Sequence, residues 1–368
     1  RPNNQRPHDR TPARLVDAAE HRGSFSLRIY WSFGYLPKTL LLNDVTALLS
    51  LVPAFGYLPK TLLLNDNFKS DSAYVLNMIP VCDVQSRETD NRFKLTKVGV
   101  TGVKKPVFVK RNGRENGHSG TLSCTIDIFV DLPAVQKGSH LSRNLEVLRE
   151  IVEESVRQPV SGIENLAADI CKKLLDRHEY ASTANVRMVA DYFKSSRTPN
   201  GRETLETYSL LGESVYKRGE KVRKTIGVKV IGMTACPCAQ ETVTESLSCS
   251  REWPVMSHNQ RNICTVILEM DEDINIEADL LIDLVEGAFS SPTYELLKRD
   301  DEAAVVINAH RNPKFVEDVV RDVLKLLVDN CTDLPDNVGV TVRSESEESI
   351  HKHNAFAERK ATLGDLRA

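Results

Sequence analysis

Hydrophobic and polar positions along the chain predict strands that are separated by pairs of amphipathic helices. Residues 93–110 are rich in valine and threonine, which favours a strand. At 126–131 isoleucine or valine occupies every second position, a pattern typical of a half-buried strand. Strand-like sequence returns at 183–193. Between residues 131 and 183 apolar and polar residues do not alternate, so this stretch predicts an element other than a strand.

Two amphipathic helices are predicted in that stretch, because apolar residues recur there at helical spacing. The apolar face of the first helix is formed by Leu145, Leu148, Ile151, Val152 and Val156. That of the second is formed by Ile163, Leu166, Ala167, Ile170, Leu174 and Leu175. Each helix therefore has one face to bury against a sheet.

The second half of the chain repeats this order. Strands are predicted at 222–230, 263–270 and 338–342, and one helix carries the apolar positions Leu280, Leu281, Leu284, Val285 and Ala288. A further helix is predicted over 313–327, with Asn312 as its N-cap and acidic residues in its early turns. We therefore predict an α+β protein with tandem units at 73–215 and 216–368, each an antiparallel sheet with a helix pair on one face.

Residues 1–72 differ from this pattern. The segment FGYLPKTLLLND at 33–44 recurs letter for letter at 55–66. Natural repeats drift in sequence, and a repeat architecture needs at least three copies. The identity therefore indicates a recent duplication or a gene-model artefact, and we expect no catalytic residue here.

Charge and composition narrow the class of protein. The 48 Lys and Arg residues nearly balance the 51 Asp and Glu residues, which argues against a nucleic-acid-coating or membrane-surface protein. The longest apolar stretch, 39–58, is interrupted by Asn43 and Asp44, and we see no secretory signal. Eight cysteines are too few for a disulfide scaffold. These features favour a cytoplasmic enzyme with reduced thiols, and no nucleic-acid or membrane partner.

Soft metal ligands occur at three places in the second half. Cys236 and Cys238 follow a predicted strand, His258 precedes another, and His351 and His353 follow a third. On an extended segment the last two imidazoles would face the same side. One cysteine and two histidines suit Zn²⁺ or Fe²⁺ and leave a position for water, as in catalytic sites. The alternative for the cysteine pair is two buried thiols.

Other candidates carry a weaker signal. Glu302 and Glu317 could complete a metal or ligand site, although a solvated helix residue or a cap explains each as well. A glycine turn opens into a helix at 137–143, with the candidate residues Lys137, Ser139, His140, Ser142 and Arg143. This is a plausible phosphate-binding arrangement, or ordinary N-capping by Ser139. We expect His178 and His310 at the surface.

Seven motifs, taken together, resemble the type IB GTP cyclohydrolases, and most closely the archaeal branch that begins methanopterin synthesis. The resemblance extends from about residue 77 to the C-terminus. In chain order the motifs are VGVTGVKKPV, FVDLPAVQKGSHLSR, GMTACPCAQ, SHNQR, LLKRDDE, NPKFVED and ESIHKHNA.

The resemblance implies a tunnelling fold and a homotetramer with active sites between subunits. It also implies the metal ligands Cys236, His258 and His351, with His353 as a neighbour and Glu302 as a further ligand. Glu317 would anchor the guanine ring. The triphosphate and ribose would lie near Lys137, Ser139, His140 and Arg143.

The implied reaction is attack of hydroxide at guanine C8, with ring opening and release of formate. The archaeal branch would give dihydroneopterin 2′,3′-cyclic phosphate and pyrophosphate and would use Fe²⁺, with Mn²⁺ or Zn²⁺ as alternatives. His140 or His353 could move protons. Other hypotheses are a folate-type enzyme that makes the triphosphate, a binding protein with structural zinc, and a thiol oxidoreductase that would need Cys238.

Overall fold

The computed structural model describes residues 40–42, 62–64, 83–110, 119–248 and 255–368. The chain forms two compact units, Arg1–Asp83 and Val84–Ala368. In the first unit, β1 (Leu40–Leu42) pairs in parallel with β2 (Leu62–Leu64), so corresponding leucines of the two repeat copies are neighbours. The rest of the repeat lies outside the described residues.

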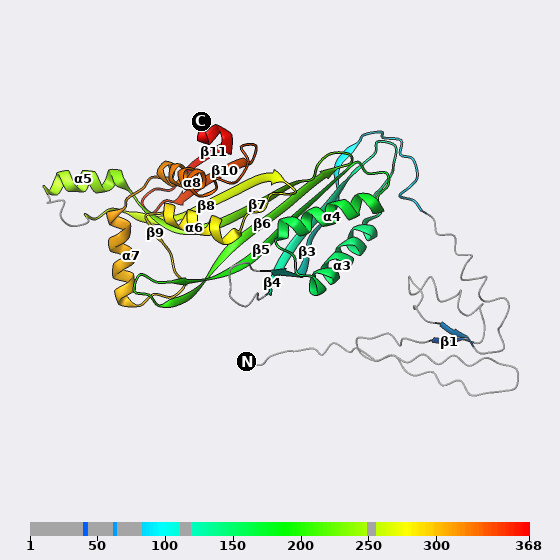
Figure 1. Ribbon diagram of the computed structural model, residues 1–368, viewed down its shortest axis with the longest axis horizontal. Coiled ribbons are helices and arrows are strands. Elements are labelled where there is room, and N and C mark those ends of the chain that lie inside the picture. Colours follow the sequence, from blue (N-terminus) through cyan, green and yellow to red (C-terminus); the bar gives the residue numbers. More distant parts are fainter. Residues whose placement is uncertain (1–39, 43–61, 65–82, 111–118, 249–254) are drawn as a thin grey trace, which may run out of the picture. The chain divides into compact units, whose positions relative to one another are not determined.

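The second unit is built on one antiparallel sheet, ordered β11-β10-β8-β7-β6-β5-β4-β3, with β9 paired to β7 (Figure 1). The bounds are β3 (Leu95–Lys110), β4 (Ser119–Leu132), β5 (Thr183–Arg197), β6 (Glu203–Lys217), β7 (Arg223–Ala235), β8 (Asn259–Asp271), β9 (Ser291–Pro292), β10 (Gly339–Glu347) and β11 (Ala355–Thr362). The sheet runs without a break from β6 to β7. The predicted boundary between the two tandem units, at residues 215 and 216, falls inside β6, and the division into two units stays a prediction.

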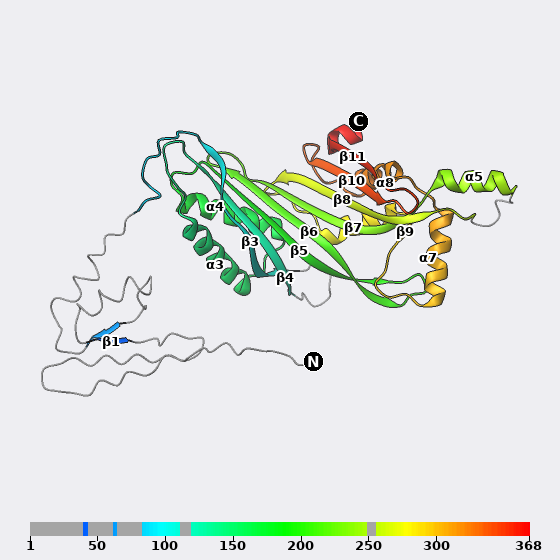
Figure 2. The ribbon, with the colours of Figure 1, turned by 180° about the vertical axis from the view of Figure 1, so that it is seen from behind.

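Helices cover this sheet. They are α3 (Leu141–Arg157), α4 (Ile163–Arg177), α5 (Pro237–Leu247), α6 (Ala278–Ala288), α7 (Arg299–Arg311), α8 (Val316–Asn330) and α9 (Leu363–Arg367). In Figures 1 and 2, α3 and α4 lie over one half of the sheet and α6 and α8 over the other, while α5 and α7 lie near the end of β7. The predicted α+β class, with helices against an antiparallel sheet, is confirmed. No helix was predicted at α5.

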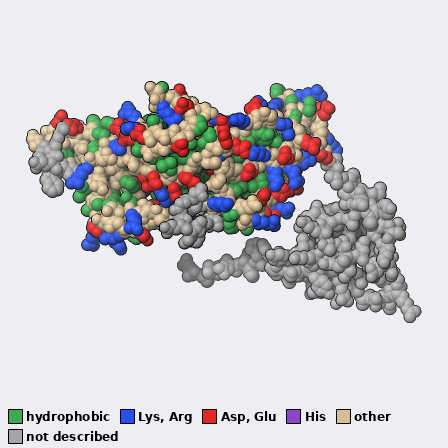
Figure 3. All heavy atoms as spheres, viewed as in Figure 1, with side chains coloured by type: hydrophobic (Ala, Val, Ile, Leu, Met, Phe, Trp, Pro, Cys, Tyr) green, Lys and Arg blue, Asp and Glu red, His purple; other side chains and the backbone are tan. Residues whose placement is uncertain are grey.

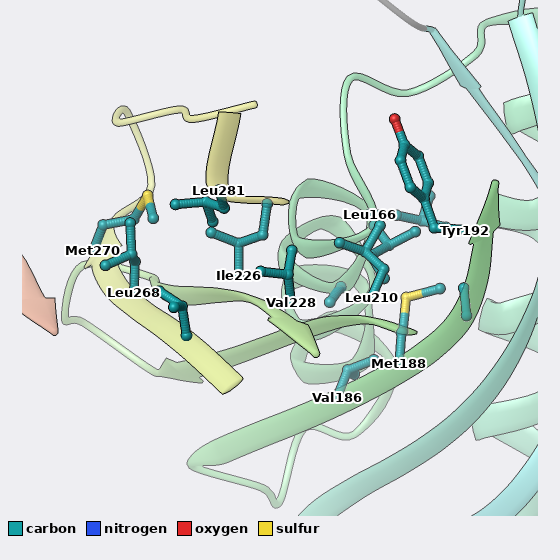
Figure 4. Close-up of a cluster of buried hydrophobic side chains, with 14 of the residues drawn as sticks. Leu166, Val186, Met188, Tyr192, Leu210, Ile226, Val228, Leu268, Met270 and Leu281 are labelled. Atoms are coloured by element: carbon teal, nitrogen blue, oxygen red, sulfur yellow. The ribbon is translucent and has the colours of Figure 1, made fainter. Parts of the chain in front are cut away.

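The core joins the two halves. Figure 4 shows buried side chains of α4 and α6 against four neighbouring strands: Leu166, Val186, Met188, Tyr192, Leu210, Ile226, Val228, Leu268, Met270 and Leu281. The predicted alternation in β4 is confirmed, because Ile126, Ile128 and Val130 are buried. So is the entire predicted face of α4. These apolar side chains form one continuous core from β5 through β6 and β7 to β8, and their burial stabilises the two halves of the sheet as one body.

The predicted face of α3 is partly wrong. Leu145 and Val156 have 46% and 55% of their surface exposed, whereas Asn144, Val147 and Ser155 are buried. The helix is therefore rotated toward the face that contains Asn144. Oδ1 of Asn144 bonds to a polar partner in the interior, and an apolar sequence pattern does not reveal such a partner.

The start of α8 also differs from the prediction. The helix begins at Val316, with Phe315 as N-cap, and Asn312 is the C-cap of α7. The backbone N–H of Lys314 donates to the carbonyl of Ala235 at 3.0 Å, so this segment joins the end of β7 instead of starting a helix. Glu317 lies in the first turn of α8, as expected.

Surface charges agree with the near balance of the composition. Acidic and basic side chains are interspersed over the face of the second unit in Figure 3. Among the helices that the structure describes, none has the length and apolar character needed to cross a membrane.

Candidate functional site

Cys236 lies where β7 ends and α5 begins. It is the N-cap of α5, with Pro237 in the first turn, and its Sγ accepts the backbone N–H of Ala239 at 3.5 Å. The backbone N–H of Cys236 donates to the carbonyl of His258 at 3.0 Å, and the Ser257 hydroxyl donates to the Cys236 carbonyl at 2.6 Å. Pairing of β7 with β8 therefore places Cys236 beside His258, although 21 residues separate them.

The His258 ring is half-buried and held on one side. Its Nδ1 lies 3.0 Å from Oε1 of Gln260 and 3.8 Å from Oε2 of Glu348. Gln260 in turn donates from Nε2 to Glu348 at 3.4 Å. With the amide oriented in this way, Nδ1 carries the proton and Nε2 keeps its lone pair. A histidine that is oriented through one ring nitrogen can bind a metal with the other.

His351 and His353 lie in the connection between β10 and β11. The ring centroid of His351 is 6.4 Å from that of His258, edge-on at 88°. His353 stacks on His351, with centroids 5.2 Å apart and planes 12° from parallel. The two imidazoles thus face each other, on a bent loop rather than on a strand.

The donor types at this end of the sheet fit a first-row divalent ion, which binds thiolate and imidazole ligands. Within the described ranges, no group of three His, Cys, Asp or Glu side chains is close enough to hold a metal ion. The backbones of Cys236 and His258 are hydrogen-bonded to each other, whereas the side chains of Cys236, His258 and His351 lie further apart than the ligands of a bound ion would.

Glu302 lies in the first turn of α7 and is exposed. The last turn of this helix, not its first, approaches His258, because the Nε2 atom of His310 lies 3.1 Å from the Ser257 carbonyl. Glu302 precedes His310 by eight residues. At the rise of an α-helix that separation is about 12 Å. Glu317 is exposed and follows Lys314 by three residues. Because the backbone N–H of Lys314 donates to the carbonyl of Ala235 at the end of β7, Glu317 is closer than Glu302 to a residue that is bonded to the site.

His310 is half-buried, so its expected place at the surface is wrong. Its Nδ1 lies 2.8 Å from the Val306 carbonyl, and its own carbonyl accepts the Gln240 side-chain amide at 2.7 Å. Gln240 also donates to the Val255 carbonyl at 2.8 Å. These bonds hold α5, α7 and the approach to β8 together around Cys236 and His258.

The 137–143 loop, whose last three residues begin α3, lies beside the half of the sheet that α3 and α4 cover. The Ser139 hydroxyl is 2.8 Å from the Tyr180 hydroxyl, to which the backbone N–H of His140 also donates at 3.4 Å. His140, not Ser139, is the N-cap of α3, and it makes no side-chain cap bond. Capping by Ser139 is therefore wrong, because its hydroxyl is engaged by Tyr180. Lys137 is exposed, and Arg143 donates to the Arg177 carbonyl at 3.1 Å.

His178 was expected at the surface and is instead completely buried behind this loop. Its Nε2 lies 2.7 Å from Oδ1 of Asn144, and its Nδ1 lies 2.8 Å from the Tyr180 hydroxyl. Burial, and then the nearby charges of Arg143 and His140, lower the pKa of His178 to about 4, so it is neutral at pH 7. The apolar sequence pattern contained no signal for this buried pair, because Asn144 lay outside the predicted apolar face of the helix.

Comparison with known proteins decides the family. The model of the type I GTP cyclohydrolase folE2 family matches residues 81–357. The chain belongs to this family. Its relatives include GTP cyclohydrolase MptA 1 of Methanocella arvoryzae, 44% identical over 79% of this chain and 97% of that protein. GTP cyclohydrolase MptA of Methanothermobacter thermautotrophicus is 43% identical over 77% of this chain and 94% of that protein.

The prediction that this chain is an enzyme of the GTP cyclohydrolase class is therefore confirmed. Among solved structures, uricase from Arthrobacter globiformis aligns at a TM-score of 0.42 and 8% identity, over 73% of this chain and 93% of that one. At that score the likeness supports no statement about function.

Proposed function

We propose that the chain opens the guanine imidazole ring of GTP at C8 and releases formate, using a divalent metal ion. Cys236, His258 and His351 would hold the ion; Glu302, predicted as a further ligand, lies within one chain at the opposite end of α7 from the turn that approaches His258. The product would be 7,8-dihydroneopterin 2′,3′-cyclic phosphate, with pyrophosphate. The observation that supports this proposal most is the direct backbone pairing of Cys236 with His258, with the His351 ring edge-on at 6.4 Å.

The bound ion would supply Lewis acidity and a water molecule whose pKa is lowered from 15.7 toward about 7. We expect Fe²⁺, with Mn²⁺ or Zn²⁺ as alternatives, because Cys/His/His suits several ions. The chain's own contribution starts with His258, which Gln260 and Glu348 orient through Nδ1. His353, stacked on His351, is positioned to hold or pass a proton through its imidazole nitrogens.

The substrate contacts would come from two copies of the chain. Figure 1 shows the starts of α5 and α3, where Cys236 and His140 lie, over well-separated parts of the same sheet. A neighbouring subunit could bring its 137–143 loop to the Cys236 end, in a homotetramer with active sites between subunits. The phosphates and ribose would then contact Lys137, Ser139, His140 and Arg143. Glu317 would accept the N–H groups of the guanine edge.

Anaerobic incubation of metal-stripped protein with GTP tests the proposal. Fe²⁺, Mn²⁺ or Zn²⁺ is added separately, and formate and pterin are identified by mass. Formate with a cyclic phosphate would support the full proposal, while formate with the triphosphate would move the enzyme to the folate type. No turnover with any ion, by folded protein, would contradict catalysis and favour a binding protein with structural zinc.

Matched cysteine variants sharpen this test. Cys236→Ser should abolish turnover and weaken metal binding, since Cys236 is the proposed ligand. Cys238→Ser should retain both, because the Cys238 thiol is exposed on α5. Equal loss in the two variants would contradict the ligand assignment and favour a dithiol mechanism. We also propose that the protein is located in the cytoplasm.

A further inference from the structure

We propose that Tyr180, oriented by His178 and Asn144, is a positioning residue that fixes the 137–143 loop for nucleotide binding. The inference rests on the proposed function, in which this loop contacts the phosphates and ribose of GTP. None of the three residues is proposed to touch the substrate. They act through Ser139 and His140, to which the Tyr180 hydroxyl is bonded.

The hydrogen bonds of this network have one consistent direction. With the Asn144 amide oriented so that Oδ1 faces His178, Nε2 of His178 donates to it at 2.7 Å. A neutral imidazole with its proton on Nε2 has an acceptor at Nδ1, and the Tyr180 hydroxyl must donate there at 2.8 Å. The Tyr180 oxygen is then left as an acceptor for the Ser139 hydroxyl at 2.8 Å and the His140 N–H at 3.4 Å.

This direction is maintained at neutral pH. Burial and the neighbouring charges of Arg143 and His140 lower the pKa of His178 to about 4, so Nδ1 remains an acceptor. The side chains of His178 and Asn144 are completely buried, which keeps competing water away from them. A buried chain of hydrogen bonds in which both ring nitrogens of His178 have partners favours one geometry of the Tyr180 hydroxyl.

Tyr180 itself is on a well-anchored segment. His178 is the C-cap of α4, with its N–H bonded to the Leu174 carbonyl at 2.8 Å. Two residues after Tyr180, the N–H and hydroxyl of Ser182 donate to Asp131 at 2.7 and 2.6 Å. Tyr180 therefore ties the loop to the turn between α4 and β5.

Other bonds hold the two ends of the loop, and at its end Arg143 donates to the Arg177 carbonyl at 3.1 Å. The N–H groups of Lys137 and Gly138 donate to the carbonyls of Arg87 and Gln85, at 2.8 and 3.0 Å. These bonds fix the entrance of the loop, before Ser139. Tyr180 acts where the chain turns into α3, at Ser139 and His140, two of the four residues that are proposed to contact the nucleotide. Its removal should therefore disturb binding geometry while leaving the metal ligands in place.

Steady-state kinetics of the full-length, metal-loaded enzyme test this inference. Tyr180→Phe should raise the KM for GTP about tenfold, which corresponds to about 1.4 kcal/mol. Its kcat should stay within about twofold, because no group near the reacting C8 is altered. Tyr192→Phe is the matched control, since it removes another mostly buried tyrosine hydroxyl, bonded to Asp279 at 2.6 Å, from a distant part of the core. It should leave KM unchanged.

Two His178 variants provide a rescue experiment. His178→Asn places an amide near the former Nδ1 and should keep KM within about threefold of wild type. His178→Leu has no acceptor for Tyr180 and should match Tyr180→Phe. Combining His178→Leu with Tyr180→Phe should raise KM no further, since both changes break the same chain of bonds. Additive increases would contradict coupling of the two residues.

Hydrogen exchange separates this inference from the proposed function. In Tyr180→Phe, backbone amides of residues 139–143 should exchange faster than in Tyr192→Phe, with or without turnover. Absence of GTP turnover in the wild type would refute the proposed function, and faster exchange would still support positioning by Tyr180. Exchange and KM both equal to those of Tyr192→Phe would overturn the inference.

Discussion

Asp131 offers a direct test of the charge network that holds the turn before β5. Its side chain is almost fully buried at the end of β4. Oδ1 accepts the N–H groups of Ser182 and Thr183 at 2.7 and 2.8 Å, and Oδ2 accepts the Ser182 hydroxyl and pairs with Lys94 at 2.8 Å. Asp131→Asn preserves the size of the side chain. It removes the charge and replaces Oδ2, or Oδ1, with a donor.

The size of the effect follows from the pKa of Asp131. Burial by itself would raise this pKa, but the bonds from Lys94, Ser182 and Thr183 outweigh it and lower the pKa from 3.8 to about 2. The unfolded chain therefore binds the proton more readily than the folded one. The stabilisation is complete above the unfolded pKa and is lost as the pH falls through the folded value. At pH 7 it amounts to about 2 kcal/mol.

Chemical denaturation at pH 7 and pH 3, at one protein concentration, measures this effect. Asp131→Asn should lower the free energy of unfolding by about 2 kcal/mol at pH 7, and by about half of that at pH 3. In a thermal scan at pH 7, the Tm should fall by about 5 °C. Asp329→Asn is the control, because solvent screens the exposed pair of Asp329 with Lys325, so its loss should change stability little. A penalty for Asp131→Asn that is absent at pH 7, or equal at both pH values, would refute the reasoning.

Three further predictions concern packing, buried charge and metal dependence. Gly232→Ala should destabilise the fold by about 2–3 kcal/mol in denaturation, because a Cβ there would overlap the Phe289 ring; a stability equal to wild type would show that the ring can move. Lys224→Met should cost about 3 kcal/mol, since it removes the bonds from Nζ to Oδ1 of Asn165 and of Asn275, at 2.6 and 2.9 Å, and the positive charge near the buried Glu164; adding Glu164→Gln should recover part of the loss if that charge matters. Chelation should stop formate release without unfolding the protein, as judged by circular dichroism, and re-addition of the ion should restore it; unfolding on chelation would identify a structural metal instead.

Local patterns in the sequence predicted several of the elements, although not α5, and indicated the residue types of the candidate site. Period-two alternation located β4, and period 3.6 located α4 with every predicted core residue. Local patterns of this kind depend only on neighbouring residues. The motifs around Cys236 and His258 likewise indicated the family, because residue type and spacing are properties of the chain.

Tertiary structure alone decided which residues meet. Pairing of β7 with β8 puts Cys236 against His258 across a long intervening segment, and pairing of β6 with β7 merges the two halves into one sheet. The rotation of α3 likewise depends on a residue distant in sequence. Asn144 faces inward, where its Oδ1 bonds to His178, and His178 is tolerated in the interior because Asn144 and Tyr180 bond both of its ring nitrogens. A buried polar group is stable only with its partners present, and folding determines those partners.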